Sequence, residues 1–292
     1  MKIWMISPVG TLMSVVVALC APLISSKMGL AFNITSNPNT SNLLNAILGE
    51  TTGLSNFDIS VSGNSMAFGL FTDDPFGLKS GVVLSTGNVE ELSGVNTLDG
   101  TTLDGDGIPL RDLSTNFNGF CLPECDTTTV EIQFDVGDNV EKVFFNYVFG
   151  SEEFVEFGDR GFNDSFALSL NGQNLARLSD GQTVDINTIV PNSTDPTSFH
   201  PDYINNPAGS STPTKLDGYT QVLGFEGILT QNARNTLTIQ IADVGDNWFD
   251  SAVFIQGGTL GTTPPTTSVP EPNLLLGLVG MGAIAYSRKR QV

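Results

Sequence analysis

The chain has 292 residues, and its 31 acidic against 12 basic residues give a formal net charge of −19. This charge excludes binding to nucleic acid or anionic membrane surfaces through clustered Lys and Arg, because an acidic chain repels phosphate. The single histidine, His200, excludes catalysis that needs two histidines and zinc sites built on several. The 40% hydrophobic content is that of a globular protein long enough to bury a core.

The first 31 residues are typical of a secretory signal peptide. Lys2 supplies positive charge near the start, an apolar run extends from Val15 to Ile24, and small residues stand at Gly29 and Ala31. We expect cleavage after Ala31 and export of the mature chain. The alternative is an uncleaved membrane anchor, which is disfavoured because the run is short against the ~20 residues of a span.

Residues 32–260 form the predicted folded domain, which begins with one helix. Ser41 is expected to cap this helix, and Gly49 is expected to end it. Its apolar residues recur at helical spacing: Leu43, Leu44, Ile47 and Leu48.

All later elements of the domain are predicted to be strands. Alternation is clearest in residues 129–136, where Val130, Ile132 and Phe134 share one side. The other expected strands are 57–61, 66–71, 81–84, 142–149, 166–170, 221–229, 236–242 and 251–255. Many short strands without strand–helix alternation predict an all-β fold, a β-sandwich of jelly-roll type.

Two long segments interrupt the strands, and we expect both to be functional or mobile loops. They run from Glu90 to Cys125 and from Pro191 to Pro213. The first contains Cys121 and Cys125, which are expected to form a disulfide in an exported protein. Metal binding by these two cysteines is the less favoured alternative.

Acidic residues gather next to two expected strand ends. Glu152 and Glu153 end one strand, Asn163 and Asp164 open the next, and a second cluster lies between Asp243 and Ser251. Clustered carboxylates repel one another, and Ca²⁺, which takes 6–8 oxygen ligands, removes that cost. The expected Ca²⁺ ligands are Glu152, Glu153, Asn163, Asp164, Asp246 and Asp250. The alternative is a solvated acidic rim without an ion.

A third acidic tract runs from Asp99 to Gly107. It departs from the EF-hand pattern, because Ile108 and Pro109 would occupy positions five and six of a loop that begins at Asp104. We therefore expect a flexible Gly/Asp loop there.

Several ordered sequence blocks carry a family resemblance. They are Gly81–Gly87, Phe149–Phe154, Phe162–Phe166 with a following Leu-Asn-Gly, Val184–Thr188 and Asp250–Ile255. Together these blocks resemble the choice-of-anchor L domain over roughly residues 42–257. That family is defined by a shared extracellular domain attached to different C-terminal anchors. The resemblance implies export and surface display, and it does not supply a substrate.

The C-terminal residues differ sharply from the domain. Residues 261–269 form a Pro/Thr-rich linker, and residues 270–292 hold a short apolar run at 274–286. The distinctive residues are Pro270, Glu271 and Pro272 before this run, and Arg288, Lys289 and Arg290 after it. This order resembles a PEP-CTERM sorting signal, which implies a short transmembrane helix, transient inner-membrane anchoring and processing by an exosortase-type enzyme. A plain C-terminal membrane helix is the alternative.

These features favour an exported, non-catalytic protein at the cell surface or in the extracellular matrix. We expect a Ca²⁺-steadied β-sandwich that binds polysaccharide or other surface components, although a purely structural protein without a ligand fits equally. The alternative is a secreted carbohydrate-active hydrolase with paired carboxylates. Glu152 and Glu153 are poor candidates for that pair, because adjacent strand residues point to opposite faces. His200 is expected to be an ordinary loop residue.

Overall fold

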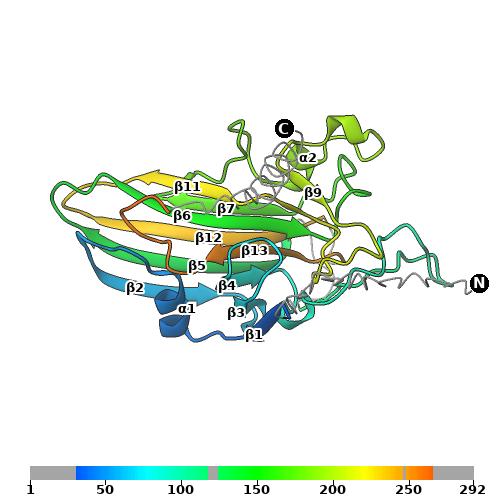
Figure 1. Ribbon diagram of the computed structural model, residues 1–292, viewed down its shortest axis with the longest axis horizontal. Coiled ribbons are helices and arrows are strands. Elements are labelled where there is room, and N and C mark those ends of the chain that lie inside the picture. Colours follow the sequence, from blue (N-terminus) through cyan, green and yellow to red (C-terminus); the bar gives the residue numbers. More distant parts are fainter. Residues whose placement is uncertain (1–30, 118–123, 246–247, 266–292) are drawn as a thin grey trace, which may run out of the picture. The chain divides into compact units, whose positions relative to one another are not determined.

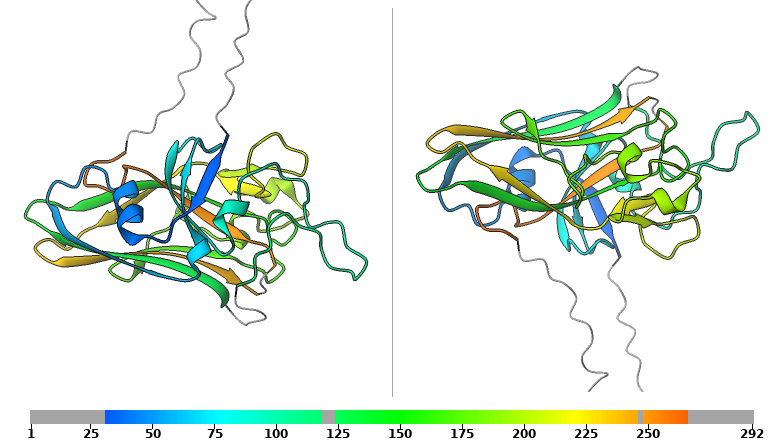
Figure 2. Two further views of the ribbon diagram at one scale, coloured as in Figure 1. Left: turned by 90° about the horizontal axis from the view of Figure 1, so that it is seen from below. Right: turned by 90° about the horizontal axis from the view of Figure 1, so that it is seen from above.

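The computed structural model describes residues 31–117, 124–245 and 248–265. Within these ranges the chain forms two antiparallel sheets (Figure 1). Figure 2 shows the sheets from below and above, as two layers with connecting loops at both ends.

The larger sheet has eight strands. Their order is β1-β3-β4-β13-β6-β10-β9, and β11 also pairs with β6. The strands are β1 (Asn33–Ser36), β3 (Phe68–Thr72), β4 (Ser80–Ser85), β6 (Lys142–Ser151), β9 (Tyr203–Asn205), β10 (Gly218–Thr220), β11 (Leu223–Ile228) and β13 (Ser251–Gln256).

The smaller sheet has five strands, in the order β2-β5-β12-β7-β8. The strands are β2 (Leu54–Ser62), β5 (Glu124–Val136), β7 (Ser165–Leu170), β8 (Gln173–Asn174) and β12 (Arg234–Val244). The helical elements are α1 (Thr40–Ile47) and α2 (Ile186–Ile189), with 3₁₀ turns η1 (Ser65–Ala67), η2 (Val89–Glu91) and η3 (Pro196–Ser198).

The main core fills the space between the sheets. Along β12, alternate residues point inward, and Leu237, Ile239 and Ile241 are all buried. Facing rings from β6 and β11 stack, with the centroids of Phe145 and Phe225 4.5 Å apart. Burial of each such side chain contributes about 1.5–3 kcal/mol to the stability of the fold. The face of the strand that carries the alternating apolar residues therefore becomes the inner face.

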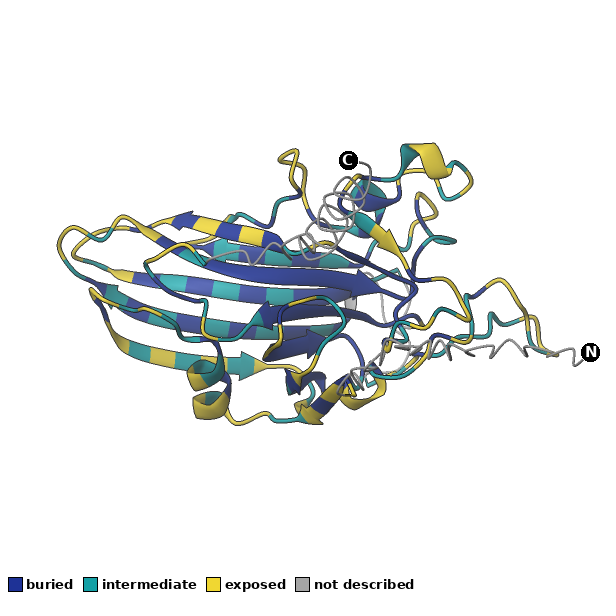
Figure 3. Cartoon of the chain, in the orientation of Figure 1, coloured by how far each residue is buried: buried dark blue, intermediate teal, exposed yellow. Residues whose placement is uncertain are grey.

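The outer face of the eight-stranded sheet is also buried. Phe71, Val83, Val148 and Phe254 lie in a second apolar cluster, which loop residues such as Leu216 help to cover. The strands β4 and β13 are therefore buried almost continuously, whereas β12 alternates between buried and half-buried residues (Figure 3). The five-stranded sheet consequently carries the accessible, polar face.

The strand register brings the predicted acidic segments to one end of the sandwich. Ser251 pairs with Ser151, Ala252 with Ser85, and Ala242 with Ser165. The connections after β4, β6 and β12 therefore emerge together, at the right of Figure 1. We call this end the acidic end.

Each of the nine predicted strands overlaps an observed one, and the two-sheet all-β fold is confirmed. The jelly-roll type stays a prediction. Sequence reasoning missed the short strands β1, β8, β9 and β10 and the one-turn helix α2. The predicted cap of α1 was wrong: Asn39, not Ser41, caps the helix, and its side chain accepts from the Asn42 N–H at 3.0 Å.

Several predictions concern parts of the chain that the structure does not describe. Residues 1–30 of the predicted signal peptide and the whole sorting signal lie outside the described residues, as do Asp246, Cys121 and the side chain of Cys125. The disulfide and the terminal segments therefore stay predictions. Within the described ranges, none of the helices has the length and hydropathy needed to cross a bilayer.

Candidate functional site

Buried carboxyl groups concentrate at the acidic end. Glu152, Glu153, Asp164 and Asp250 are between 0% and 2% exposed, and Asp217 is 3% exposed. Buried acids of this kind need hydrogen bonds, protons or cations to offset the loss of water. Their partners therefore indicate what this end of the sandwich can do.

Glu152 directly follows β6, and its side chain binds the backbone of the long loop before β5. Its carboxylate accepts the N–H groups of Asp112 and of Leu113, the latter at 2.6 Å. Burial raises the pKa of Glu152 to about 9, and these hydrogen bonds only partly oppose the rise. The neighbouring charges of Asp250 and Asp112 raise it further.

Asp250 binds the same loop from the start of β13. Its Oδ2 accepts the Thr115 N–H at 3.0 Å. The backbone of Gly87 packs directly against this carboxylate, so that a β-carbon at this position would collide with it. Burial, followed by the charge of Asp164, raises the pKa of Asp250 to about 8, although bonding to Thr115 lowers it.

Asp164 joins three strands at their ends. Its Oδ1 accepts the Val244 N–H at 3.0 Å, and its Oδ2 accepts the Ser251 hydroxyl at 2.6 Å. The hydroxyl oxygens of Ser251 and Ser151 are 2.8 Å apart. The side chain of Asn163 points elsewhere and accepts the Asn187 N–H at 2.9 Å, at the start of α2.

The structure thus brings Glu152, Asp164 and Asp250 to one end, and it gives their oxygens backbone and hydroxyl partners. Glu153 is buried beside them, and its N–H donates to the Ser151 hydroxyl at 2.9 Å. Among the residues that the structure describes, no group of three or more His, Cys, Asp or Glu side chains is placed to hold a metal ion. A cation there would need backbone carbonyls and water among its ligands.

Asp217 is a buried acid of this end that sequence reasoning missed. Its Oδ1 accepts from the Asn96 amide at 2.5 Å, and burial followed by the charge of Glu152 raises its pKa to about 10. In the sequence Asp217 has no acidic neighbour within eight positions, and it lies 65 positions after Glu152. No local pattern indicates that the two carboxyl groups interact.

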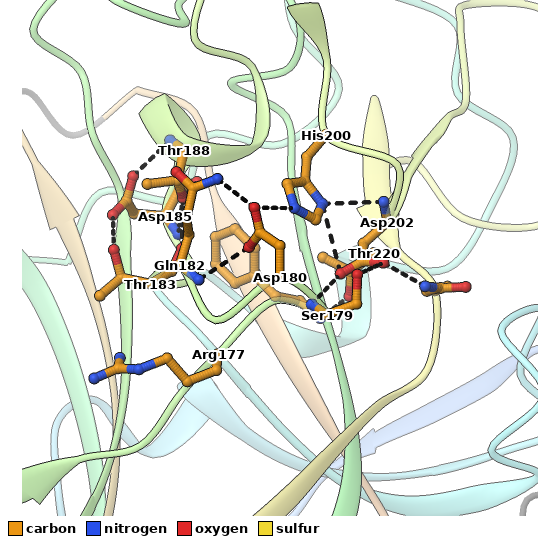
Figure 4. Close-up of polar contacts among 12 residues, drawn as sticks. Arg177, Ser179, Asp180, Gln182, Thr183, Asp185, Thr188, His200, Asp202 and Thr220 are labelled. Carbon is orange, nitrogen blue, oxygen red and sulfur yellow. Dashed lines mark hydrogen bonds and ion pairs between the residues drawn. The ribbon is translucent and has the colours of Figure 1, made fainter.

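His200 is a loop residue, as expected, but it is buried and paired with two acids (Figure 4). Its Nδ1 accepts the Asp202 N–H at 3.1 Å, and its Nε2 lies 3.2 Å from Asp180 Oδ2. The acceptor role of Nδ1 places the ring proton on Nε2 in the neutral form, facing Asp180. Bonding to Gln182, with a smaller contribution from His200, lowers the pKa of Asp180.

The residues around His200 do not form a nucleophile–base pair. The Ser179 hydroxyl donates to Asp202 Oδ1 at 2.8 Å, so the serine binds the acid and not the imidazole (Figure 4). A serine hydrolase needs the hydroxyl within hydrogen-bond reach of the base. This cluster therefore links the loops before β9 and does not have the geometry of a serine hydrolase.

The outer face of the five-stranded sheet presents polar side chains in cross-strand rows. One row joins Ser62, Thr129 and Gln240, and the next joins Ser60, Glu131 and Thr238. Hydroxyl and amide groups dominate both rows. Such a face can exchange hydrogen bonds with a hydroxyl-rich ligand.

A surface pocket lies at the opposite end of the sandwich from the acidic loops. Its volume is about 560 Å³. It is lined by Glu50, Thr52, Asn139, Val140, Glu141, Lys142, Phe144, Thr262, Thr263 and Pro264. The predicted acidic ligands do not line it.

The chain matches the choice-of-anchor L domain over residues 33–261, and it belongs to that family. No curated protein and no solved structure matches it. A choice-of-anchor domain indicates a surface-associated or exported protein, and the family is not known as catalytic.

Proposed function

We propose that this chain is an exported, surface-anchored or matrix-associated protein without catalytic activity. In this proposal Ca²⁺ stabilises the β-sandwich, and the β-sandwich binds polysaccharide or another surface component. Family membership supports display at the surface. Two observations support a binding role over the hydrolase alternative. The Ser179 hydroxyl bonds to Asp202 and not to His200, and both oxygens of the Glu152 carboxylate accept backbone N–H groups.

The observation that carries the Ca²⁺ proposal is the set of buried acids at the acidic end. The pKa values of Glu152 and Asp250 rise to about 9 and 8, so each group is either protonated or balanced by a cation at neutral pH. A Ca²⁺ ion combines carboxylates with backbone carbonyls and water, which this loop-rich end can supply.

Thermal unfolding with and without a chelator tests the Ca²⁺ proposal. A ligand that binds only the folded protein stabilises it, so Ca²⁺ should raise the melting temperature. Asp164→Asn should abolish this increase, because the amide keeps an acceptor for the Val244 N–H but loses the charge. Asp58→Asn, on exposed β2, is the matched control and should respond like the wild type. Equal melting temperatures in Ca²⁺ and chelator would remove the proposal.

The hydroxyl- and amide-rich face of the five-stranded sheet supports polysaccharide as the ligand. A glycan array with the exported protein, run with and without chelator, tests this. We expect binding that weakens by at least about tenfold when Thr238→Ala and Gln240→Ala are combined, since each lost hydrogen bond costs about 0.5–1.5 kcal/mol. If no glycan on the array binds at high protein concentration, the polysaccharide proposal is wrong and the purely structural alternative is favoured.

We further propose that an exosortase-type enzyme processes the chain near Pro270, Glu271 and Pro272. The order of motif, apolar run and basic tail supports this. In producing cells, Glu271→Ala should shift the protein from the surface or medium to the inner membrane on immunoblots of separated fractions. An unchanged distribution would favour a plain C-terminal membrane helix.

A further inference from the structure

A small cavity lies beside the acidic end, between segments that are far apart in the sequence. Its volume is about 150 Å³. It is lined by Asp99, Phe154, Val155, Glu156, Asn205, Pro207 and Asp217. Phe154 and Asp217 are buried, whereas Asn205 and Pro207 are exposed, so the cavity has a closed floor and an open rim.

Two residues that line this cavity each have a buried carboxylate oxygen without a hydrogen-bond partner. Asp217 is 3% exposed, and its Oδ2 is buried without a partner while its Oδ1 accepts from Asn96. The Oε2 of Glu156 is likewise buried without a partner. Buried polar atoms are nearly always hydrogen-bonded, so two such atoms on residues of one cavity wall indicate a missing donor.

The electrostatic surroundings favour a positively charged donor. The charged groups that act most strongly on Asp217 are the carboxylates of Glu152, Glu156 and Asp99. Burial raises the pKa of Glu156, and the charge of Asp99 raises it further. Backbone hydrogen bonds to its carboxylate lower this pKa, and the positive charge of Arg160 has a smaller lowering effect. A cation between Asp217 and Glu156 would relieve the repulsion at both groups.

The size and walls of the cavity select the kind of cation. Among the described residues no group of three or more His, Cys, Asp or Glu side chains is placed to hold a metal ion, so Asp99, Glu156 and Asp217 do not by themselves form a metal site. Phe154, Val155 and Pro207 add apolar surface beside them. The volume matches roughly five water molecules at about 30 Å³ each. An ammonium group on a short aliphatic chain fits both the acidic atoms and the apolar walls.

We propose that this cavity binds a primary alkylammonium group, with Asp217 Oδ2 and Glu156 Oε2 accepting its N–H bonds. The aliphatic carbons lie against Phe154 and Pro207, and Asp99 adds negative charge. A free diamine and a lysine side chain both carry this chemistry. The proposal goes beyond the proposed function and does not depend on Ca²⁺ binding.

Calorimetric titration of the exported protein with 1,4-diaminobutane and with Nα-acetyl-lysinamide tests the proposal. We expect saturable binding with a dissociation constant of about 1 mM or tighter for at least one of the two amines. The Nε-acetylated lysinamide, which lacks the charge, should not bind. Binding of the diamine alone indicates a free polyamine as the ligand, and binding of the lysinamide indicates a lysine side chain of a partner protein.

Two variants connect the binding to the cavity. Asp217→Asn keeps an acceptor for the Asn96 amide and Glu156→Gln keeps the side-chain shape, and each should weaken binding by at least about tenfold, the effect of losing about 1.4 kcal/mol. Asp58→Asn should leave the affinity unchanged. Melting curves of the variants establish that both are folded.

Three outcomes would overturn the proposal. They are no saturable heat with either amine, unchanged affinity in both cavity variants, and Ca²⁺ binding that Asp217→Asn abolishes while the amines do not bind. Failure of the Ca²⁺ proposal is distinguishable, because it is measured with a different probe and with Asp164→Asn.

Discussion

At the residue scale, the acids of the acidic end act first as acceptors for backbone and hydroxyl groups. Glu152 and Asp250 bind the backbone of the loop before β5, and Asp164 binds β12 and β13. Sequence reasoning identified these residues from their clustering and expected metal ligands. Their hydrogen-bond partners come from segments up to 135 positions away, so the sequence alone does not reveal them.

The buried carboxyl groups should make stability depend on pH. In the folded protein the pKa values of Glu152, Asp217 and Asp250 are about 9, 10 and 8, against about 4 in an unfolded chain. Above about pH 4 the folded protein therefore binds more protons, and its free energy of unfolding falls as the pH rises toward 8–10. In chelator, we expect a lower urea midpoint at about pH 8.5 than at about pH 6. A higher midpoint at the alkaline pH would contradict these assignments.

The single histidine should contribute to stability and not to catalysis. His200→Leu removes the acceptor of the Asp202 N–H and the partner of Asp180 while keeping an apolar side chain of similar size. Leaving a buried donor unsatisfied costs about 1–3 kcal/mol. We expect a loss of this size in urea unfolding, while Asp58→Asn should change stability by less than about 0.5 kcal/mol. A neutral His200→Leu variant would mean that these contacts contribute little.

At the element scale, strands with a clear alternation could be predicted, and the shortest elements could not. The alternation in 129–136 matches β5, because one face of that strand is buried and the other is accessible. The strands β8, β9 and β10 have two or three residues each, too few for a period to show. The helix α2 depends on a capping box between Asp185 and Thr188, whose residues are also common in loops.

Two neighbouring residues of β12 test the assignment of inner and outer faces. Ile239 is 1% exposed in the core, whereas Thr238 lies on the accessible face. Ile239→Ala should cost about 2–5 kcal/mol, because it leaves a cavity between the sheets. Thr238→Ala should cost less than about 1 kcal/mol by the same denaturation measurement. Equal losses of stability in the two variants would mean that the outer face of the five-stranded sheet is also buried.

At the scale of the whole molecule, the charge of the folded domain is the property that links sequence to function. Residues 32–260 carry 7 basic and 30 acidic residues, a net charge of −23. The fold collects part of this surplus at one end, because the connections after β4, β6 and β12 emerge together. The clustering could be predicted, whereas the contribution of Asp217 and Asp99 required the folded arrangement.

Calorimetric titration of the exported, chelator-treated protein with CaCl₂ tests the central claim most directly. We predict saturable binding that is lost in Asp164→Asn and kept in Asp58→Asn, because only the first substitution removes charge from the acidic end. Heat no larger than that of dilution, in wild type and both variants, would contradict the claim that a divalent cation balances these buried acids.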